Sequence, residues 1–118
     1  MRPAERGAVT VEAAIALSAL TLVVLAALGA VATVAAAVRC TDAARELVRL
    51  AARGEADRGR AAAAALAPGG AVIELSTTAE EVRAVVSAAP VGPLPIRVSG
   101  RAVGAREPGA ALSSEAAA

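Results

Sequence analysis

The feature that most constrains the fold is an uncharged, mainly apolar run over residues 13–38. As an α-helix this run would be about 39 Å long, at about 1.5 Å per residue. The hydrocarbon core of a bilayer is about 30 Å thick, so the helix could cross it with some tilt. The alternative is the core helix of a soluble protein. The rest of the chain is too short to enclose such a helix, so we expect a membrane span.

A secretory signal peptide is the nearer alternative. Arg2 and Arg6 precede the run, and the small residues 35–37 would suit a signal peptidase. The apolar part of a signal peptide is normally about 7–15 residues long, which is shorter than this run. We therefore expect a retained membrane helix, with a secreted protein that carries a long signal peptide as the alternative.

The chain becomes polar after residue 38 and keeps a helical period. Acidic residues at positions 42 and 46 precede Arg45 and Arg49 by three residues, which supports a helix through ion pairs. Arg45, Arg49 and Arg53 form one row, the Arg row, which we interpret as a solvated face rather than as a contact with anionic lipid or a partner. Gly54 is a candidate interruption, and the Pro-Gly-Gly sequence at 68–70 should end a helix expected over residues 8–67. The apolar stripe is formed by Cys40, Ala43, Ala44, Leu47, Leu50 and Ala51.

Three later segments alternate between apolar and polar residues, at 71–76, 82–88 and 96–103. This period predicts strands with one buried face. The proline-rich stretch between the last two segments predicts a loop. We expect an α+β fold: a long N-terminal transmembrane helix that extends into an amphipathic helix, then a small three-stranded antiparallel meander over residues 71–104. Residues 107–118 read as a disordered tail.

The composition argues against an enzyme. The chain has no His, Lys or Tyr, and Cys40 is its one cysteine. Catalytic sites draw heavily on these side chains, and a zinc site needs several His or Cys ligands. We expect no catalytic residue, metal or cofactor. The formal net charge of +1 and the lack of aromatic residues give no reason to expect nucleic-acid binding. We interpret Cys40 as a small buried apolar residue, with an intermolecular disulfide as the alternative.

The residues just before the apolar run form a distinctive pattern, Gly7-Ala8-Val9-Thr10-Val11-Glu12. A carboxylate at the edge of a membrane helix is costly without a partner. The pattern resembles the processing site of type IV prepilins and pseudopilins, which are cut after the glycine by a prepilin peptidase at the cytoplasmic face. That resemblance implies that Ala8 becomes the first mature residue. Glu12 would then be the fifth residue, placed to pair with the N-terminal amine of a neighbouring subunit.

Residues 4–107 as a whole resemble TadE-like minor pseudopilins of the tight-adherence (Flp) pilus system. Residues 1–7 are the short basic leader, "CTDAARELVRLAARG" follows the apolar run, and a β-rich part ends the chain. Major pilins usually carry a large apolar residue directly after the cut, where this chain has Ala8. The resemblance implies a role in pilus assembly. Its implied partners are a prepilin peptidase, other pilins or pseudopilins, and membrane lipid.

The resemblance also implies a topology. The protein would cross the cytoplasmic membrane once, with its N-terminus inside and its C-terminal part outside. The positive-inside rule opposes this orientation, because residues 39–53 contain more Arg than the leader does. Two alternatives to the pseudopilin hypothesis stay open: an unprocessed single-pass subunit of another membrane complex, and the secreted protein with a long signal peptide.

Overall fold

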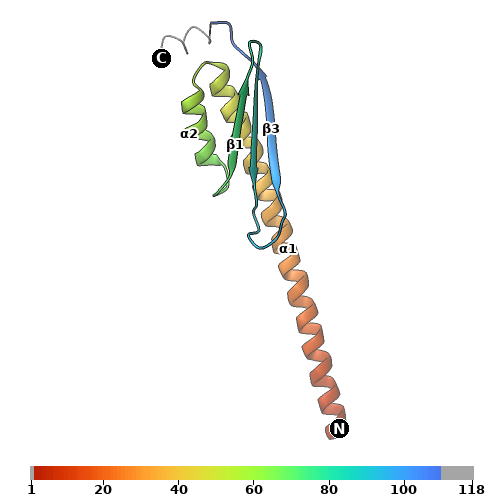
Figure 1. The fold of residues 1–118 in the computed structure, drawn as a ribbon. Helices are drawn as coiled ribbons and strands as arrows, with labels where there is room; N and C mark the ends of the chain where they lie inside the picture. The colour runs from red at the N-terminus through yellow and green to blue at the C-terminus, as the bar shows by residue number, and fades with distance from the viewer. Residues whose placement is uncertain (1, 110–118) are drawn as a thin grey trace. The chain divides into compact units, whose positions relative to one another are not determined.

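The computed structural model describes residues 2–109 of the chain. The elements run in the order α1 (Pro3–Ala52), α2 (Ala56–Leu66), β1 (Val72–Thr77), β2 (Glu81–Ala88) and β3 (Val98–Ala105) (Figure 1). The expected α+β class is confirmed: a long N-terminal helix precedes a three-stranded antiparallel sheet of order β1-β2-β3. The chain divides into two compact units, Met1–Val31 and Ala32–Ala118.

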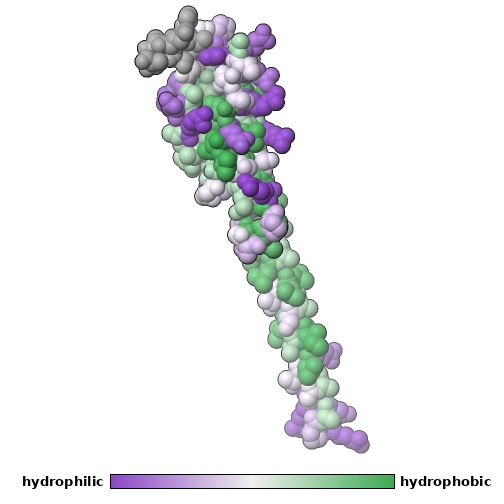
Figure 2. Space-filling model, in the orientation of Figure 1, coloured by the Kyte–Doolittle hydropathy of each residue, from purple (hydrophilic) through white to green (hydrophobic). Residues whose placement is uncertain are grey.

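The first unit consists of the N-terminal part of α1. Its large apolar side chains are exposed, and the surface in Figure 2 is mostly green beyond the polar residues at its N-terminal end. Three hydroxyl groups in or near this stretch donate to the carbonyl four residues earlier, over 2.8–2.9 Å. The donors are Thr10, Ser18 and Thr21. Helix α1 is long and apolar enough to cross a membrane, and internally satisfied hydroxyls are compatible with a lipid environment.

The boundaries of the helices differ from the expected single helix over residues 8–67. Helix α1 already begins at Pro3, where the fixed φ of proline suits a first helical position. The Arg2 N–H donates to the Glu5 carboxylate at 3.0 Å, which caps this end. Helix α1 then ends at Ala52, and Gly54 adopts a φ of 83°, a conformation that favours glycine. The expected helix is therefore two helices, separated at the glycine.

The core of the second unit lies between the sheet and the helices. The alternate residues of β2 that face inward are all buried, as the period predicted. They pack against the C-terminal part of α1, together with Ala63 of α2 and Ala67 just after it. In register, Ile73 pairs with Val86 and Leu75 with Ala84, so β1 places its apolar residues on the same face as β2. The inward residues of β2 are Val82, Ala84, Val86 and Ala88.

Strand β3 lies almost on the backbone of α1. A Cβ added to Gly100 would overlap the backbone of Cys40 and Thr41, and one added to Gly104 would be 2.6 Å from the Val48 side chain. Only glycine allows a strand to approach a helix this closely.

The apolar face expected on α1 is confirmed, since every residue of the predicted stripe is buried. The predicted tail begins at residue 107, and its residues 110–118 lie outside the described part of the chain.

Candidate functional site

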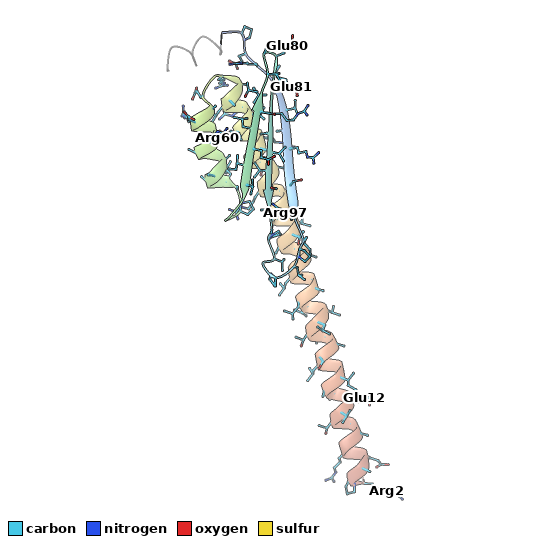
Figure 3. The ribbon with its side chains drawn as sticks, viewed as in Figure 1. Arg2, Glu12, Arg60, Glu80, Glu81 and Arg97 are labelled. Carbon is cyan, nitrogen blue, oxygen red and sulfur yellow. The ribbon has the colours of Figure 1, made fainter. Side chains whose placement is uncertain are left out.

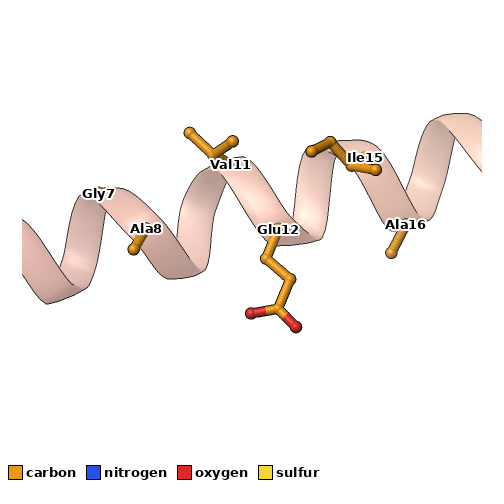
Figure 4. A pocket seen from close by; sticks show the side chains of 6 residues that line it. All are labelled: Gly7, Ala8, Val11, Glu12, Ile15 and Ala16. Carbon is orange, nitrogen blue, oxygen red and sulfur yellow. The ribbon is translucent and has the colours of Figure 1, made fainter.

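The three predicted site residues all lie on α1, within the first unit. Gly7, Ala8 and Glu12 are exposed, and with Val11, Ile15 and Ala16 they line an open hollow on the helix surface. Figure 4 shows the Ala8, Glu12 and Ala16 side chains on one side of the helix and Val11 and Ile15 on the other. One helix cannot enclose a ligand, so we interpret the hollow as a helix surface rather than as a small-molecule cavity.

The Glu12 carboxylate makes no hydrogen bond or ion pair within residues 2–109. Its neighbours one helical turn away, Ala8 and Ala16, carry no polar side chain. Glu12 also lies more than two turns after Pro3, where α1 begins. The helix dipole acts mainly within the first turn, so it gives this carboxylate little support in the intact chain. The charge thus has no stabilising group of its own in the described structure.

Gly7 has no packing role in the described structure. An added Cβ at Gly7 would meet no atom within 4 Å. A glycine inside a helix costs about 1 kcal/mol relative to alanine. The fold therefore gains nothing from glycine at position 7, in contrast to Gly100, where a side chain cannot be placed.

The Arg row at the C-terminal end of α1 is paired along its length, including Arg53, which directly follows the helix. The predicted pair Asp42–Arg45 spans 3.8 Å, and Arg49 Nε donates to Glu46 Oε2 at 2.8 Å. The hydrogen bonds from Arg49 are the largest influence on the pKa of Glu46 and lower it, and desolvation opposes the shift. The third arginine of the row, Arg53, lies 3.6 Å from Glu107. Because each Arg has an acidic neighbour, the structure favours a solvated, mutually neutralised face over a lipid-binding one.

Arg39 has a role that the sequence did not reveal. Its Nε donates to the Leu66 carbonyl and its Nη2 to the Ala67 carbonyl, both at 3.2 Å. These carbonyls lie at the C-terminal end of α2, where the last helical carbonyls lack intrahelical donors. Arg39 therefore caps α2 from α1. The sequence holds no signal for this contact, because the partners are far apart in the chain and the acceptors are backbone atoms.

Cys40 is fully buried and is a free thiol. Burial raises the pKa of the Cys40 thiol, and the nearby Arg39 charge lowers it to a smaller extent. The structure thus agrees with the interpretation of Cys40 as a small buried apolar residue. Across residues 2–109, no group of three or more His, Cys, Asp or Glu side chains is arranged to hold a metal ion.

Comparison with known proteins identifies a curated relative. The chain is 39% identical over 98 residues to "Apoptosis inhibitor Rv3655c" of Mycobacterium tuberculosis (strain ATCC 25618 / H37Rv). The match covers 83% of this chain and 78% of the relative. No protein-family profile matches the chain, and no solved structure matches it. At this identity and coverage, the chain belongs to the same family as Rv3655c.

Proposed function

We propose that this chain is a minor pseudopilin-like membrane protein that takes part in assembly of a Flp-type pilus. The proposal includes cleavage after Gly7 and a membrane span over about residues 13–38. Its partners would be a prepilin peptidase, other pilins or pseudopilins, the assembly machinery and membrane lipid. The observation that carries it is Glu12, a carboxylate without a partner in the described structure, directly before an apolar run whose large side chains are exposed as far as Val31.

Cleavage after Gly7 would give Glu12 two kinds of support. The mature helix would begin at Ala8, which brings Glu12 close to the positive end of the helix dipole. Cleavage also creates an α-amine, and an amine of a neighbouring subunit could pair with the carboxylate. A carboxylate and an ammonium cost less in hydrocarbon as a pair than apart.

The glycine itself adds a second line of support. Nothing in the described fold requires glycine at position 7, yet alanine would stabilise the helix. A requirement of a peptidase for a small residue at the cut would account for it. The paired Arg row on α1 agrees with a soluble surface for the second unit, which the proposal places outside the membrane.

The test is the N-terminus of the protein isolated from membranes of its own host. We expect the wild-type chain to begin at Ala8, and the Gly7→Ala variant to retain residues 1–7. The matched control is Gly29→Ala, another helical glycine whose added Cβ would meet nothing within 4 Å. That control should be processed normally. An intact N-terminus in the wild type would favour the unprocessed membrane subunit, and a start near residue 38 would favour the secreted protein.

The orientation needs its own test, because the count of flanking Arg residues opposes it. We expect the second unit to be digested by a protease added outside intact spheroplasts. Protection in intact spheroplasts, with digestion only after lysis, would place the second unit in the cytoplasm and contradict a pseudopilin topology.

The family relationship favours a second candidate function, suppression of apoptosis in another cell. Its basis is the printed name of the relative, at 39% identity. The measurement is caspase activity in cultured animal cells given an apoptotic stimulus, with and without the purified chain. Lower caspase activity that depends on the folded second unit would support this candidate. Unchanged activity would remove it and leave the pseudopilin proposal intact.

A further inference from the structure

Strand β3 forms an edge of the sheet with no neighbour in the described structure. The sheet order is β1-β2-β3, so β3 pairs with β2 on one side only (Figure 1). The opposite edge, β1, is shorter, and its inward residues pack in one cluster with Ala63 and Ala67 of the α2 region. The edge of β3 is therefore the longer and less covered one.

The hydrogen-bond pattern identifies which backbone groups β3 leaves unpaired. In an antiparallel ladder, residues bonded to one neighbour alternate with residues whose N–H and C=O point the other way. Arg106 donates its N–H to the Glu80 carbonyl at 2.9 Å, so β3 residues with even numbers face β2. The N–H and C=O groups that point to the open side belong to Ser99, Arg101, Val103 and Ala105, which are all exposed.

This edge lacks the usual protection against strand addition. Edge strands are commonly shortened or blocked by proline, bulges or several charges. Strand β3 has eight residues, no proline and a single charged residue, Arg101. Its inner face is already covered by α1 at Gly100 and Gly104. An added strand would thus extend the sheet beyond β3 without having to cover the inner face of β3, which already contacts α1.

The charges next to the edge indicate what kind of strand fits. Residues 96–106 contain three Arg and no acidic residue. Arg97 and Arg101 form no ion pair within residues 2–109, and Figure 3 shows Arg97 at the start of β3. Arg106 donates to the Thr78 carbonyl at 3.4 Å. Arg101 lies in β3 and Arg97 directly before it, and the Cα atoms of positions four residues apart in an extended strand are about 13 Å from each other.

We propose that the β3 edge binds an extended, acidic segment of a partner protein by adding a strand to the sheet. The backbone groups of the open edge would supply affinity, and Arg97 and Arg101 would select carboxylates spaced four residues apart. Pairing with β3 of a second copy is disfavoured, because it adds arginine opposite an edge that already lacks carboxylates. This inference is independent of cleavage after Gly7, so the two proposals can fail separately.

The test uses the full chain in phosphatidylcholine nanodiscs and a fluorescent nine-residue peptide. The peptide alternates threonine and valine and carries glutamate at its third and seventh positions, with a lysine version as its control. We expect the glutamate peptide to bind and the lysine peptide not to bind. The double variant Arg97→Gln/Arg101→Gln should weaken binding about tenfold, the size expected for loss of two exposed ion pairs.

Two further variants separate edge pairing from general charge attraction. Arg60→Gln removes one unpaired charge from α2, away from the edge, and should leave binding within about twofold. Val103→Pro removes an N–H on the open side without removing a bond to β2, and should abolish binding, whereas Val103→Thr should retain it. Circular dichroism checks that each variant is folded.

Three outcomes would overturn the proposal. One is equal binding of both peptides, and another is full binding by a folded Val103→Pro variant. The third is a dimer of the chain that Val103→Pro dissociates, since this would assign the edge to a second copy.

Discussion

The two compact units of this chain use similar amino acids in opposite ways. Both are rich in Ala and Val, yet the large apolar residues of Met1–Val31 are exposed, whereas the second unit has a core in which Leu47, Val82 and Val86 are fully buried. The second unit can bury apolar residues because they alternate with less buried residues along β2, which gives the strand one inward face. The first unit has no such pattern within its apolar run. An apolar surface of this kind is typical of a contact with another molecule, and lipid is the simplest candidate.

Polar groups differ between the units in the same way. In the first unit, hydroxyls bond back to their own helix, so they need no solvent. In the second unit, no charged or polar residue among those described is buried, and several charged groups form ion pairs on the surface. Replacing an exposed apolar side chain by a charged one should therefore have a different energetic cost in each unit, even where the side chains are similarly exposed.

The sharpest test of this comparison places a charge on an exposed leucine in each unit. Leu25 is 58% exposed and Leu94 is 49% exposed. We expect Leu25→Arg to disfavour membrane insertion by about 3 kcal/mol, because arginine is costly at the centre of a membrane helix. Leu94→Arg should change the stability of the second unit by less than about 0.5 kcal/mol. Carbonate extraction of membranes measures the first effect. Equal extraction of both variants would contradict a membrane span.

The next prediction concerns the contact between β3 and α1. Gly100→Ala should destabilise the second unit by about 2–3 kcal/mol, since the new Cβ would overlap helix backbone rather than a movable side chain. Gly92→Ala is the matched control, because its added Cβ would meet nothing within 4 Å. Thermal unfolding followed by far-UV circular dichroism measures both. If the two variants melt together, β3 does not rest on the helix as described.

A smaller effect is expected at the cap of α2. Arg39→Gln should cost the second unit about 1 kcal/mol, because the freed carbonyls near residues 66 and 67 can still bind water. Hydrogen exchange should show faster opening of α2 than of β2. The control Arg45→Gln, which removes an exposed ion pair, should leave α2 unchanged. Unchanged exchange in both variants would remove the capping role.

The smallest effect is a pH dependence from Glu46. Its pKa is lowered from the ordinary value of 4.5 by hydrogen bonds from Arg49, so folding favours its ionised form. The resulting stability is present above the pKa of the unfolded chain and is lost as the pH falls through the folded pKa. The melting temperature of Glu46→Gln should therefore fall less steeply than that of the wild type as the pH drops below 4.5. An unchanged acid slope in Glu46→Gln would contradict this.

Much of the fold could be predicted because its signals are local. The uncharged run specifies a long helix, and alternation in residues 82–88 gives the inward face of β2 directly. The helix break had no equally local signal, since a glycine in a helical pattern is compatible with either the continuation or the end of the helix. Gly54 has a φ of 83° in the connection between α1 and α2, and composition alone does not specify that conformation.

The features that escaped prediction depend on contacts between distant segments. Arg39 was counted among flanking charges, although it bonds to carbonyls at residues 66 and 67. Nothing in the sequence singled out Gly100, yet a Cβ added there would overlap the backbone of Cys40 and Thr41. In the candidate site, the sequence indicated Glu12 as unusual. Only the structure shows that α1 begins at Pro3, so that the carboxylate lies well inside the helix of the intact chain.

The burial of Cys40 has a practical consequence for anyone who studies this protein. The chain has no Trp, Tyr or Phe, so fluorescence and near-ultraviolet absorbance do not report on its folding. The thiol of Cys40 can serve as a probe instead, because it lies beneath β3 with no exposed surface. Its raised pKa also reduces the fraction of thiolate, which is the form that reacts with an alkylating reagent. Its rate of reaction with iodoacetamide would measure how often the sheet separates from the helix. The same shielding keeps the closed protein from forming mixed disulfides, even in an oxidising compartment.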